Sequence, residues 1–417
     1  MRHLTLFLLL LTTLFSCRDP LVQDPLSRSM RMQDRFARYA RSGIGVSDSS
    51  AVSPPGPEEP KGPDFYATAL YFPDSANWRL DSLWAARVLL FKNGELTGSY
   101  PVPSPPDPER HRVRGGHLWT DMTDGRTTRI LCDGVEKYSF SGEELIRGFL
   151  QLGGALYTLG QRPGRGGFCY RVNGKPVFES PVGTLLGNAS LPEWEGGALG
   201  LDGGDICYSY SIPVQRKDRL EWEYHVMRGS ESLQTLPAGT AEALYDIRVW
   251  DGKVYRIQKK DGQICLADGV NSYAMSASLS DSFSGHLIPY KGSLTLKGSS
   301  RAGGEAFNCW IYDPSIWNAR SFGRVPSERS ALLVDGDDWL LASVNPSGVV
   351  EDLLLGREKL PLPGGPYQLM TPLCLSLSGG HYAAALTHAS GSRHLLIADG
   401  KTYELPFNGY FTSVRIE

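Results

Sequence analysis

Four tryptophans offer side chains that could bind a ligand. Trp78, Trp194, Trp222 and Trp317 stand in polar, loop-like contexts, which read SANWRL, LPEWEGG, RLEWEY and SIWNAR. Exposed aromatic rings on loops are platforms for sugars and for protein partners. The alternative is that these rings pack between neighbouring structural units, and the sequence leaves both interpretations open.

The remaining polar residues show no catalytic or metal-binding motif. The histidines are scattered, without HExxH spacing and without a carboxylate at ligand spacing, and no GxSxG or phosphate-binding loop is present. His117 and His381 share one position in a repeat, which favours a structural role. Asp202 and Asp205 could bind calcium, but they lie where turns favour aspartate. We expect no catalytic residue, no metal ion and no cofactor.

The N-terminus carries an export signal. Arg2 precedes an apolar stretch from Leu4 to Phe15, which is shorter than the roughly 20 residues that a membrane-spanning helix needs. The residues Leu14-Phe15-Ser16-Cys17 resemble the lipobox of bacterial lipoproteins. The resemblance implies cleavage after residue 16 and a lipid thioether on Cys17, which anchors the chain firmly once two or more acyl chains are attached. The alternative is an ordinary signal peptide followed by a coincidental cysteine.

Composition indicates a globular protein with many turns. The chain has 417 residues, 41% of them hydrophobic, and a net charge of −3, which gives no bias towards nucleic acid. The 47 glycines and 28 prolines favour short β-strands. Six cysteines follow Cys17, about one per repeat unit, and this spacing favours reduced core positions over disulfide bonds. They are Cys132, Cys169, Cys207, Cys265, Cys309 and Cys374.

Residues 17–63 differ from the rest of the chain. Arginines at 28, 31, 35, 38 and 41 follow the spacing of a basic amphipathic helix, which could lie on anionic headgroups beside the anchor. A solvated helix or a disordered tether fits equally well. Residues 42–63 form a linker rich in proline, glycine and serine that would reach about 25 Å if flexible. The folded body is therefore expected to stand away from the membrane.

An internal repeat predicts the fold of residues 64–417. Strands ending in a glycine turn, mostly Asn-Gly or Asp-Gly, finish at Gly94, Gly134, Gly174, Gly229, Gly269, Gly356 and Gly400. Such pairs between apolar runs are a strong hairpin signal, because both positions need positive φ. A second glycine precedes a short strand about twenty residues before most turns, at Gly116, Gly154, Gly204, Gly252, Gly292, Gly336 and Gly380. Each unit of 40–50 residues then holds four strands.

Four strands per unit of this length resemble the blade of a β-propeller. We predict an all-β chain with a single propeller of eight four-stranded blades, or seven if one unit is misread. The first unit, from Asp64, lacks an initial strand, whereas Tyr410–Glu417 forms a strand without a partner. The C-terminal strand is therefore expected to complete the first blade and close the ring. The sequence matches no propeller family closely.

These features favour three functions, in decreasing order. The first is a non-catalytic envelope protein that binds a glycan or a protein partner, and the second is a hydrolase or lyase acting on polysaccharide with carboxylates at the channel. The third is a structural subunit of an envelope complex. Arg18 follows Cys17 in place of the aspartate associated with retention in the inner membrane, which favours the outer membrane. The sequence does not decide whether the protein faces the periplasm or the cell surface. We expect a monomer.

Overall fold

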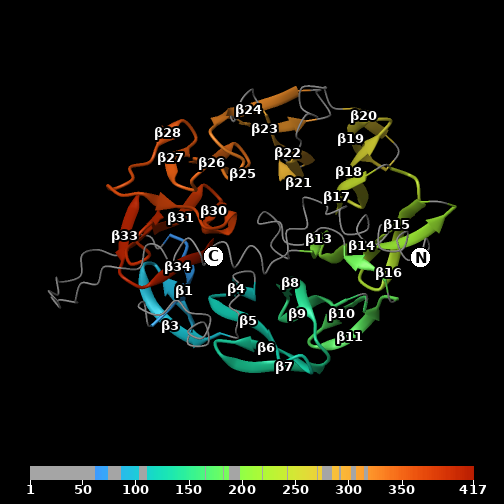
Figure 1. Ribbon diagram of the computed structural model, residues 1–417, viewed down its shortest axis with the longest axis horizontal. Coiled ribbons are helices and arrows are strands. Elements are labelled where there is room, and N and C mark those ends of the chain that lie inside the picture. The colour runs from blue at the N-terminus through green and yellow to red at the C-terminus, as the bar shows by residue number, and fades with distance from the viewer. Residues whose placement is uncertain are drawn as a thin grey trace, which may run out of the picture.

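The computed structural model is a ring of β-sheets around a central axis (Figure 1). It describes residues 62–417 except 74–85, 103–109, 165, 182, 187–197, 218, 242, 270, 275–283, 291–292, 302–306 and 314–317. The described residues form eight antiparallel sheets of four or five strands. The sheets follow one another around the ring in chain order (Figure 1). This arrangement is a β-propeller, and the predicted all-β fold class is confirmed.

The first four blades come from the N-terminal half of the described chain, with one strand from the C-terminus. Blade 1 contains β34 (Gly409–Ile416), β1 (Phe65–Tyr71), β2 (Arg87–Lys92) and β3 (Glu95–Pro101). Blade 2 contains β4 (His111–Arg114), β5 (His117–Thr123), β6 (Thr127–Cys132) and β7 (Val135–Ser141). Blade 3 contains β8 (Leu145–Leu152), β9 (Ala155–Gln161), β10 (Phe168–Val172) and β11 (Lys175–Glu179). Blade 4 contains β12 (Leu185–Leu186), β13 (Gly200–Asp202), β14 (Asp205–Arg216), β15 (Arg219–Arg228) and β16 (Glu231–Leu236).

The other four blades complete the ring. Blade 5 contains β17 (Ala243–Trp250), β18 (Lys253–Lys260), β19 (Gln263–Asp268) and β20 (Asn271–Ala274). Blade 6 contains β21 (Ser284–Tyr290), β22 (Ser293–Arg301), β23 (Phe307–Asp313) and β24 (Asn318–Val325). Blade 7 contains β25 (Ala331–Asp335), β26 (Asp338–Val344), β27 (Val350–Leu355) and β28 (Glu358–Lys359). Blade 8 contains β29 (Tyr367–Gln368), β30 (Leu375–Ser378), β31 (His381–His388), β32 (His394–Ala398) and β33 (Lys401–Leu405), with the 3-10 helix η3 (Pro372–Cys374) before β30.

The hairpin turns adopt the backbone conformation that their residue types require. Asn173 and Gly174 have φ values of 50° and 77°, and Asp133 and Gly134 have 49° and 77°. Positive φ at both central positions matches the right-handed twist of the flanking strands. Blade 3 contains the four strands predicted for each unit, as β8 to β11. The repeat in the sequence is therefore a repeat of hairpins.

Blades 4 and 8 depart from the regular pattern. In each, two short strands pair with the same long strand: β12 and β13 with β14, and β29 and β30 with β31. In blade 8 the interruption contains η3, which begins at Pro372. The sequence repeat did not show these interruptions.

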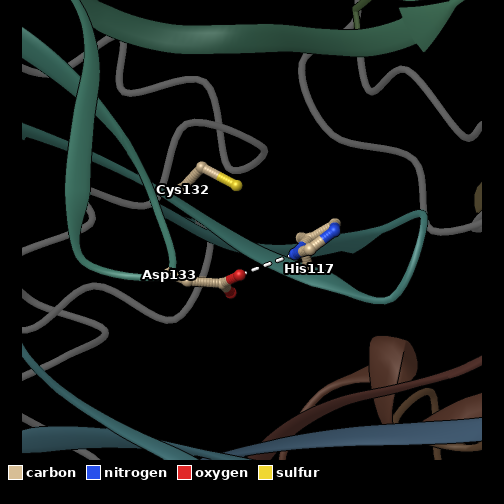
Figure 2. A group of neighbouring side chains, drawn as sticks. All are labelled: His117, Cys132 and Asp133. Atoms are coloured by element: carbon tan, nitrogen blue, oxygen red, sulfur yellow. Dashed lines mark hydrogen bonds and ion pairs between the residues drawn. The ribbon is translucent and has the colours of Figure 1, made fainter.

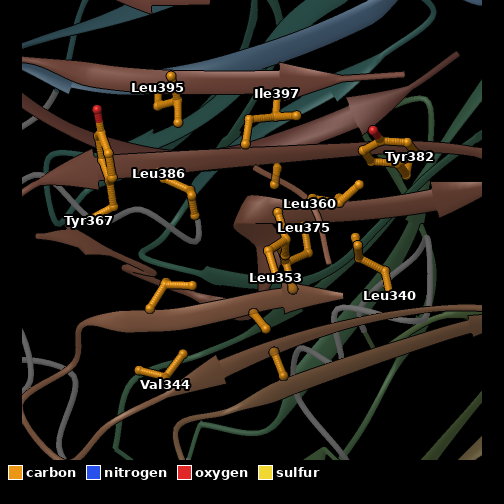
Figure 3. Close-up of a cluster of buried hydrophobic side chains, with 14 residues drawn as sticks. Leu340, Val344, Leu353, Leu360, Tyr367, Leu375, Tyr382, Leu386, Leu395 and Ile397 are labelled. Atoms are coloured by element: carbon orange, nitrogen blue, oxygen red, sulfur yellow. The ribbon is translucent and has the colours of Figure 1, made fainter. Parts of the chain in front are cut away.

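Apolar side chains between the blades form the core. The described residues contain eight clusters of buried hydrophobic residues, one between each pair of neighbouring blades. Figure 3 shows the cluster between blades 7 and 8, where Leu340 and Leu353 face Leu386 and Leu395. All four side chains are fully buried. Each blade is thus held by apolar contacts on both of its faces.

The C-terminal strand belongs to blade 1. β34 pairs antiparallel with β1, in a register that places Ala67 opposite Val414. Two backbone hydrogen bonds join Asp64 and Glu417, from N to O in each direction, at 3.0 and 2.9 Å. The first blade is therefore assembled from both ends of the described chain.

The six cysteines after Cys17 are free and buried, which confirms the reduced core positions predicted for them. Burial raises the pKa of Cys169, Cys207, Cys309 and Cys374 to about 11, so these thiols stay protonated at neutral pH. Residues 1–61, with Cys17, the arginine-rich segment and most of the tether, lie outside the described residues. Within the described part, no helix is long and apolar enough to span a membrane.

Candidate functional site at the turn face

One face of the ring carries most of the short turns. In an antiparallel meander the turn between the first and second strands lies at the same end as the turn between the third and fourth. The first strand of each blade lies nearest the axis and the last lies at the rim (Figure 1). We call the end with the β4–β5, β13–β14, β17–β18, β25–β26 and β30–β31 turns the turn face.

Carboxylates on this face link successive blades. Asp202, the last residue of β13, accepts a hydrogen bond from the N–H of Gly252 in the next blade at 3.0 Å. Asp335, at the end of β25, accepts one from the N–H of Gly379 at 2.7 Å. The carboxylate of Glu417, directly after β34, accepts bonds from the N–H groups of Gly115 and Gly116. The glycines that mark the repeat thus lie in turns whose N–H groups bind the preceding blade.

A groove of about 510 Å³ opens on the turn face between blades 4 and 5. This volume lies in the range of small-molecule sites. The lining comes from the β13–β14 turn, the end of β15 and the β17–β18 turn: Leu201, Asp202, Gly203, Asp205, Arg228, Trp250, Asp251 and Gly252. The groove therefore combines one aromatic ring with a set of charged side chains.

Trp250 borders the groove on the side of blade 5. It ends β17, where Ile247 and Val249 are buried against blade 4 and fix the strand. The indole is half-buried and packs partly against the apolar cluster of blades 5 and 6, which contains Ile257. Asp251 follows in the left-handed conformation, with φ of 49°, and turns the chain. Because Ile247 and Val249 face blade 4, the alternation of side chains along β17 directs Trp250 to the side of blade 6, and the residue borders the groove at the end of the strand.

The charged side of the groove is mainly acidic. Asp202 is buried, and its Oδ2 accepts a bond from Arg228 at 3.1 Å in addition to the bond from Gly252. Arg228 also lies 3.5 Å from Asp205, whose side chain is 61% exposed. Asp251 is exposed. Three carboxylates against one guanidinium favour neutral polyhydroxy or cationic groups and disfavour phosphate and uronate.

Of the four tryptophans selected from the sequence, the structure describes Trp222. Trp78, Trp194 and Trp317 are outside the described residues. Trp222 is described as a half-buried residue on β15, opposite Pro213. It lies six residues along the strand from Arg228, which corresponds to about 20 Å. Trp250 was not predicted as a ligand-binding residue, although its place close to the repeat glycine Gly252 was a usable signal.

The two repeat-related histidines form the same contact. His117 Nδ1 lies 2.6 Å from Asp133 Oδ2, and His381 Nδ1 lies 2.6 Å from Asp399 Oδ2. Both aspartates occupy hairpin turns with positive φ, and their Oδ1 atoms accept the N–H of Leu118 and Tyr382 at 2.9 Å. The predicted structural role of these histidines agrees with this geometry.

The buried carboxylates of the described residues pair with arginines. Asp121 lies 2.8 Å from Arg112, Glu144 lies 2.8 Å from Arg171, and Asp246 lies 3.4 Å from Arg248. Each of these carboxylates thus forms an ion pair with a guanidinium, which favours a structural role for them.

Comparison with known proteins adds information on the fold. No protein-family model and no curated protein matches this chain. Apo AztD from Citrobacter koseri is similar in structure, with a TM-score of 0.47 and 12% identity over 85% of this chain and 98% of that one. The β-propeller domain of the Trilobed protease from Pyrococcus furiosus has a TM-score of 0.40 and 9% identity, over 66% of this chain and 85% of that one. BamB from Moraxella catarrhalis has a TM-score of 0.38 and 12% identity, over 73% of this chain and 89% of that one. At these identities the similarity concerns the fold alone.

Proposed function

We propose that this chain is a lipoprotein of the cell envelope whose propeller binds a glycan or a protein partner without catalysing a reaction. The groove beside Trp250 is the observation that carries the proposal. It brings Trp250 together with hydrogen-bonding side chains from two blades. This combination suits a sugar ring, which offers an apolar face for stacking and hydroxyl groups for carboxylates and guanidinium.

The charge of the groove narrows the ligand class. Asp205 and Asp251 are exposed and line the groove, together with the positive group of Arg228. Neutral sugars, amino sugars and basic peptide segments fit this balance. Acidic polysaccharides and nucleic acids would bring like charge against the carboxylates.

The proposed arrangement has three parts. Residues 1–16 form the signal peptide, residues 17–63 carry the lipid on Cys17 and act as a basic tether, and residues 64–417 form the propeller. The tether allows the propeller, and with it the groove, to lie away from the membrane surface. We assign the anchor to the outer membrane and the protein to a monomeric state.

The anchor is tested by Cys17→Ser in the full chain. We expect the variant to leave the membrane fraction and to appear in the soluble fraction, with an unchanged thermal melt. Retention of the variant in the membrane at the wild-type level would show that the anchor is not the lipid and would point to the arginine-rich segment.

The binding role is tested by a screen of the full chain against neutral, amino and acidic oligosaccharides, together with a pull-down from membranes. We expect a binder in the neutral or amino class or a specific protein partner. Analysis of each bound oligosaccharide after incubation separates binding from cleavage. Shortened products would favour the polysaccharide hydrolase or lyase instead, and the absence of any binder would contradict the proposal.

A further inference from the structure

A group of three potential metal ligands lies on the turn face of blade 2, outside the groove. One donor atom from each of His117, Cys132 and Asp133 lies within 4.8 Å of the other two. Figure 2 shows the imidazole and the carboxylate facing each other, with the thiol beside them. We propose that these three residues bind a divalent transition metal of the Zn²⁺ class.

The β5–β6 hairpin brings His117 next to Asp133, which follows sixteen residues later in the chain and directly after Cys132. Asp133 has φ of 49°, and this left-handed turn directs its carboxylate back towards the start of β5. Oδ1 accepts the N–H of Leu118 at 2.9 Å, while Oδ2 faces His117. The backbone N–H of Asp133 bonds to the carbonyl of Leu118 at 2.8 Å. The carboxylate is therefore fixed by the backbone, with one oxygen directed at the imidazole.

The thiol supplies the third donor. Cys132 pairs with Trp119 across the β5–β6 ladder and is largely buried, and this burial raises the pKa of its thiol. A metal ion would bind the thiolate, so one proton leaves Cys132 for solvent when the metal–sulfur bond forms. Metal affinity should therefore increase with pH.

The spacing needs a small adjustment to hold a metal ion. Tetrahedral zinc has bonds of about 2.0 to 2.3 Å, which place its ligand atoms roughly 3 to 4 Å apart. The His117–Asp133 contact at 2.6 Å is shorter than this, and all three donor atoms lie within 4.8 Å of one another. The His117 side chain is 59% exposed and has room to rotate. Three protein ligands leave a fourth position for water, as in exchangeable rather than closed structural sites.

Blade 8 provides an internal comparison. His381 and Asp399 repeat the histidine–aspartate contact at the same 2.6 Å, but Ala398 occupies the place of Cys132. The contact alone is thus a feature of the fold, and the thiol is what distinguishes blade 2. Soft thiolate ligands favour zinc and its analogues over magnesium and calcium. Cys132 therefore determines whether the group binds a metal.

The test is a titration of the purified full chain with Co²⁺, which reports thiolate coordination by an intense near-ultraviolet charge-transfer band and tetrahedral geometry by its visible bands. We expect one equivalent to bind with the thiolate band, and Zn²⁺ to displace it. Cys132→Ala, which gives blade 2 the residue set of blade 8, should abolish the band. It should weaken binding by more than about tenfold, since even residues behind the ligands contribute tenfold to a hundredfold.

Ala398→Cys is the matched gain-of-function variant. If the hairpin geometry positions the donors, this change should add a second equivalent with the same band. Thermal melts and circular dichroism identify variants that have lost the fold, and His117→Ala then provides a second loss-of-ligand test. Absence of a thiolate band in the wild-type chain, or an unchanged band in Cys132→Ala, would overturn the proposal.

Discussion

The carboxylate of Glu417 accepts hydrogen bonds from the turn N–H groups of Gly116 and Gly115, some three hundred residues earlier in the chain. Glu417 directly follows β34 of blade 1, and the two glycines form the first turn of blade 2. The same relationship joins Asp202 to Gly252 and Asp335 to Gly379. Acidic residues at the ends of inner strands thus link blades that the apolar clusters already hold together.

Replacing Glu417 tests this link. Glu417→Ala leaves two turn N–H groups without their acceptor, and we expect a loss of about 1 to 2 kcal/mol in the free energy of unfolding. Glu417→Gln keeps an acceptor oxygen and should lose less. Urea unfolding of the two variants and the wild type measures the difference. Equal stability in all three would show that solvent replaces the carboxylate without cost.

The interblade core should respond strongly to a cavity. Leu386 is fully buried in the cluster between blades 7 and 8, so Leu386→Ala should cost about 2 to 5 kcal/mol. Leu96→Ala is the control, because Leu96 is 57% exposed, and its change should stay within about 0.5 kcal/mol. Calorimetric or urea unfolding measures both. A similar cost for the two substitutions would contradict the assigned core.

A buried ion pair offers a further test of the fold. Glu144 and Arg171 are both buried and 2.8 Å apart, and Phe140 lies 4.0 Å from the guanidinium. Glu144→Gln leaves a buried guanidinium without its counter-charge, which should cost about 3 to 5 kcal/mol. Glu404→Gln breaks the exposed pair with Arg393 and should cost less than about 1 kcal/mol. Urea unfolding of the two variants measures these losses, and a larger loss of stability in Glu404→Gln than in Glu144→Gln would contradict the prediction.

Two buried histidines predict acid sensitivity. Burial lowers the pKa of His394 to about 4 and that of His111 to about 3 in the folded chain. The unfolded chain takes up these protons near pH 6.5, so this contribution to stability is complete above that pH. It is lost as the pH falls towards 4 and then 3, at about 1.4 kcal/mol per pH unit for each histidine.

His394→Gln isolates one of these contributions. His394 Nε2 lies 2.8 Å from the carbonyl oxygen of Phe407, and glutamine offers an amide donor without a titrating proton. Urea unfolding between pH 7.5 and pH 5 should show a shallower loss of stability in the variant than in the wild type. Parallel pH profiles would show that His394 is not buried in its neutral form.

The sequence predicts local structure better than contacts between blades. Asn173-Gly174 is recognisable as a hairpin turn because both positions require positive φ, and neighbouring residues decide this. The groove depends on Trp250 lying beside Asp202 of another blade, and only the packing of blades 4 and 5 brings them together. The break of the inner strand near Pro372 also depends on its place in the sheet.

The histidine–aspartate contacts could be predicted from the sequence only in part. The turn position of Asp133 follows from its Asp-Gly pair, and the place of His117 follows from the repeat. Their 2.6 Å contact follows from neither, because it depends on how the hairpin folds back on β5. A search by sequence spacing therefore missed the group that includes Cys132.

Binding at the Trp250 groove is the central claim, and a comparison of three variants tests it most directly. The affinity of the full chain for its best binder should fall at least about thirtyfold in Trp250→Ala, since an aromatic anchor contributes 2 kcal/mol or more. Asp251→Asn should weaken an amino sugar or a basic peptide but not a neutral sugar. Trp222→Ala, about 20 Å away along β15, should leave the affinity unchanged. Wild-type affinity in Trp250→Ala, or loss of binding in Trp222→Ala alone, would contradict the account.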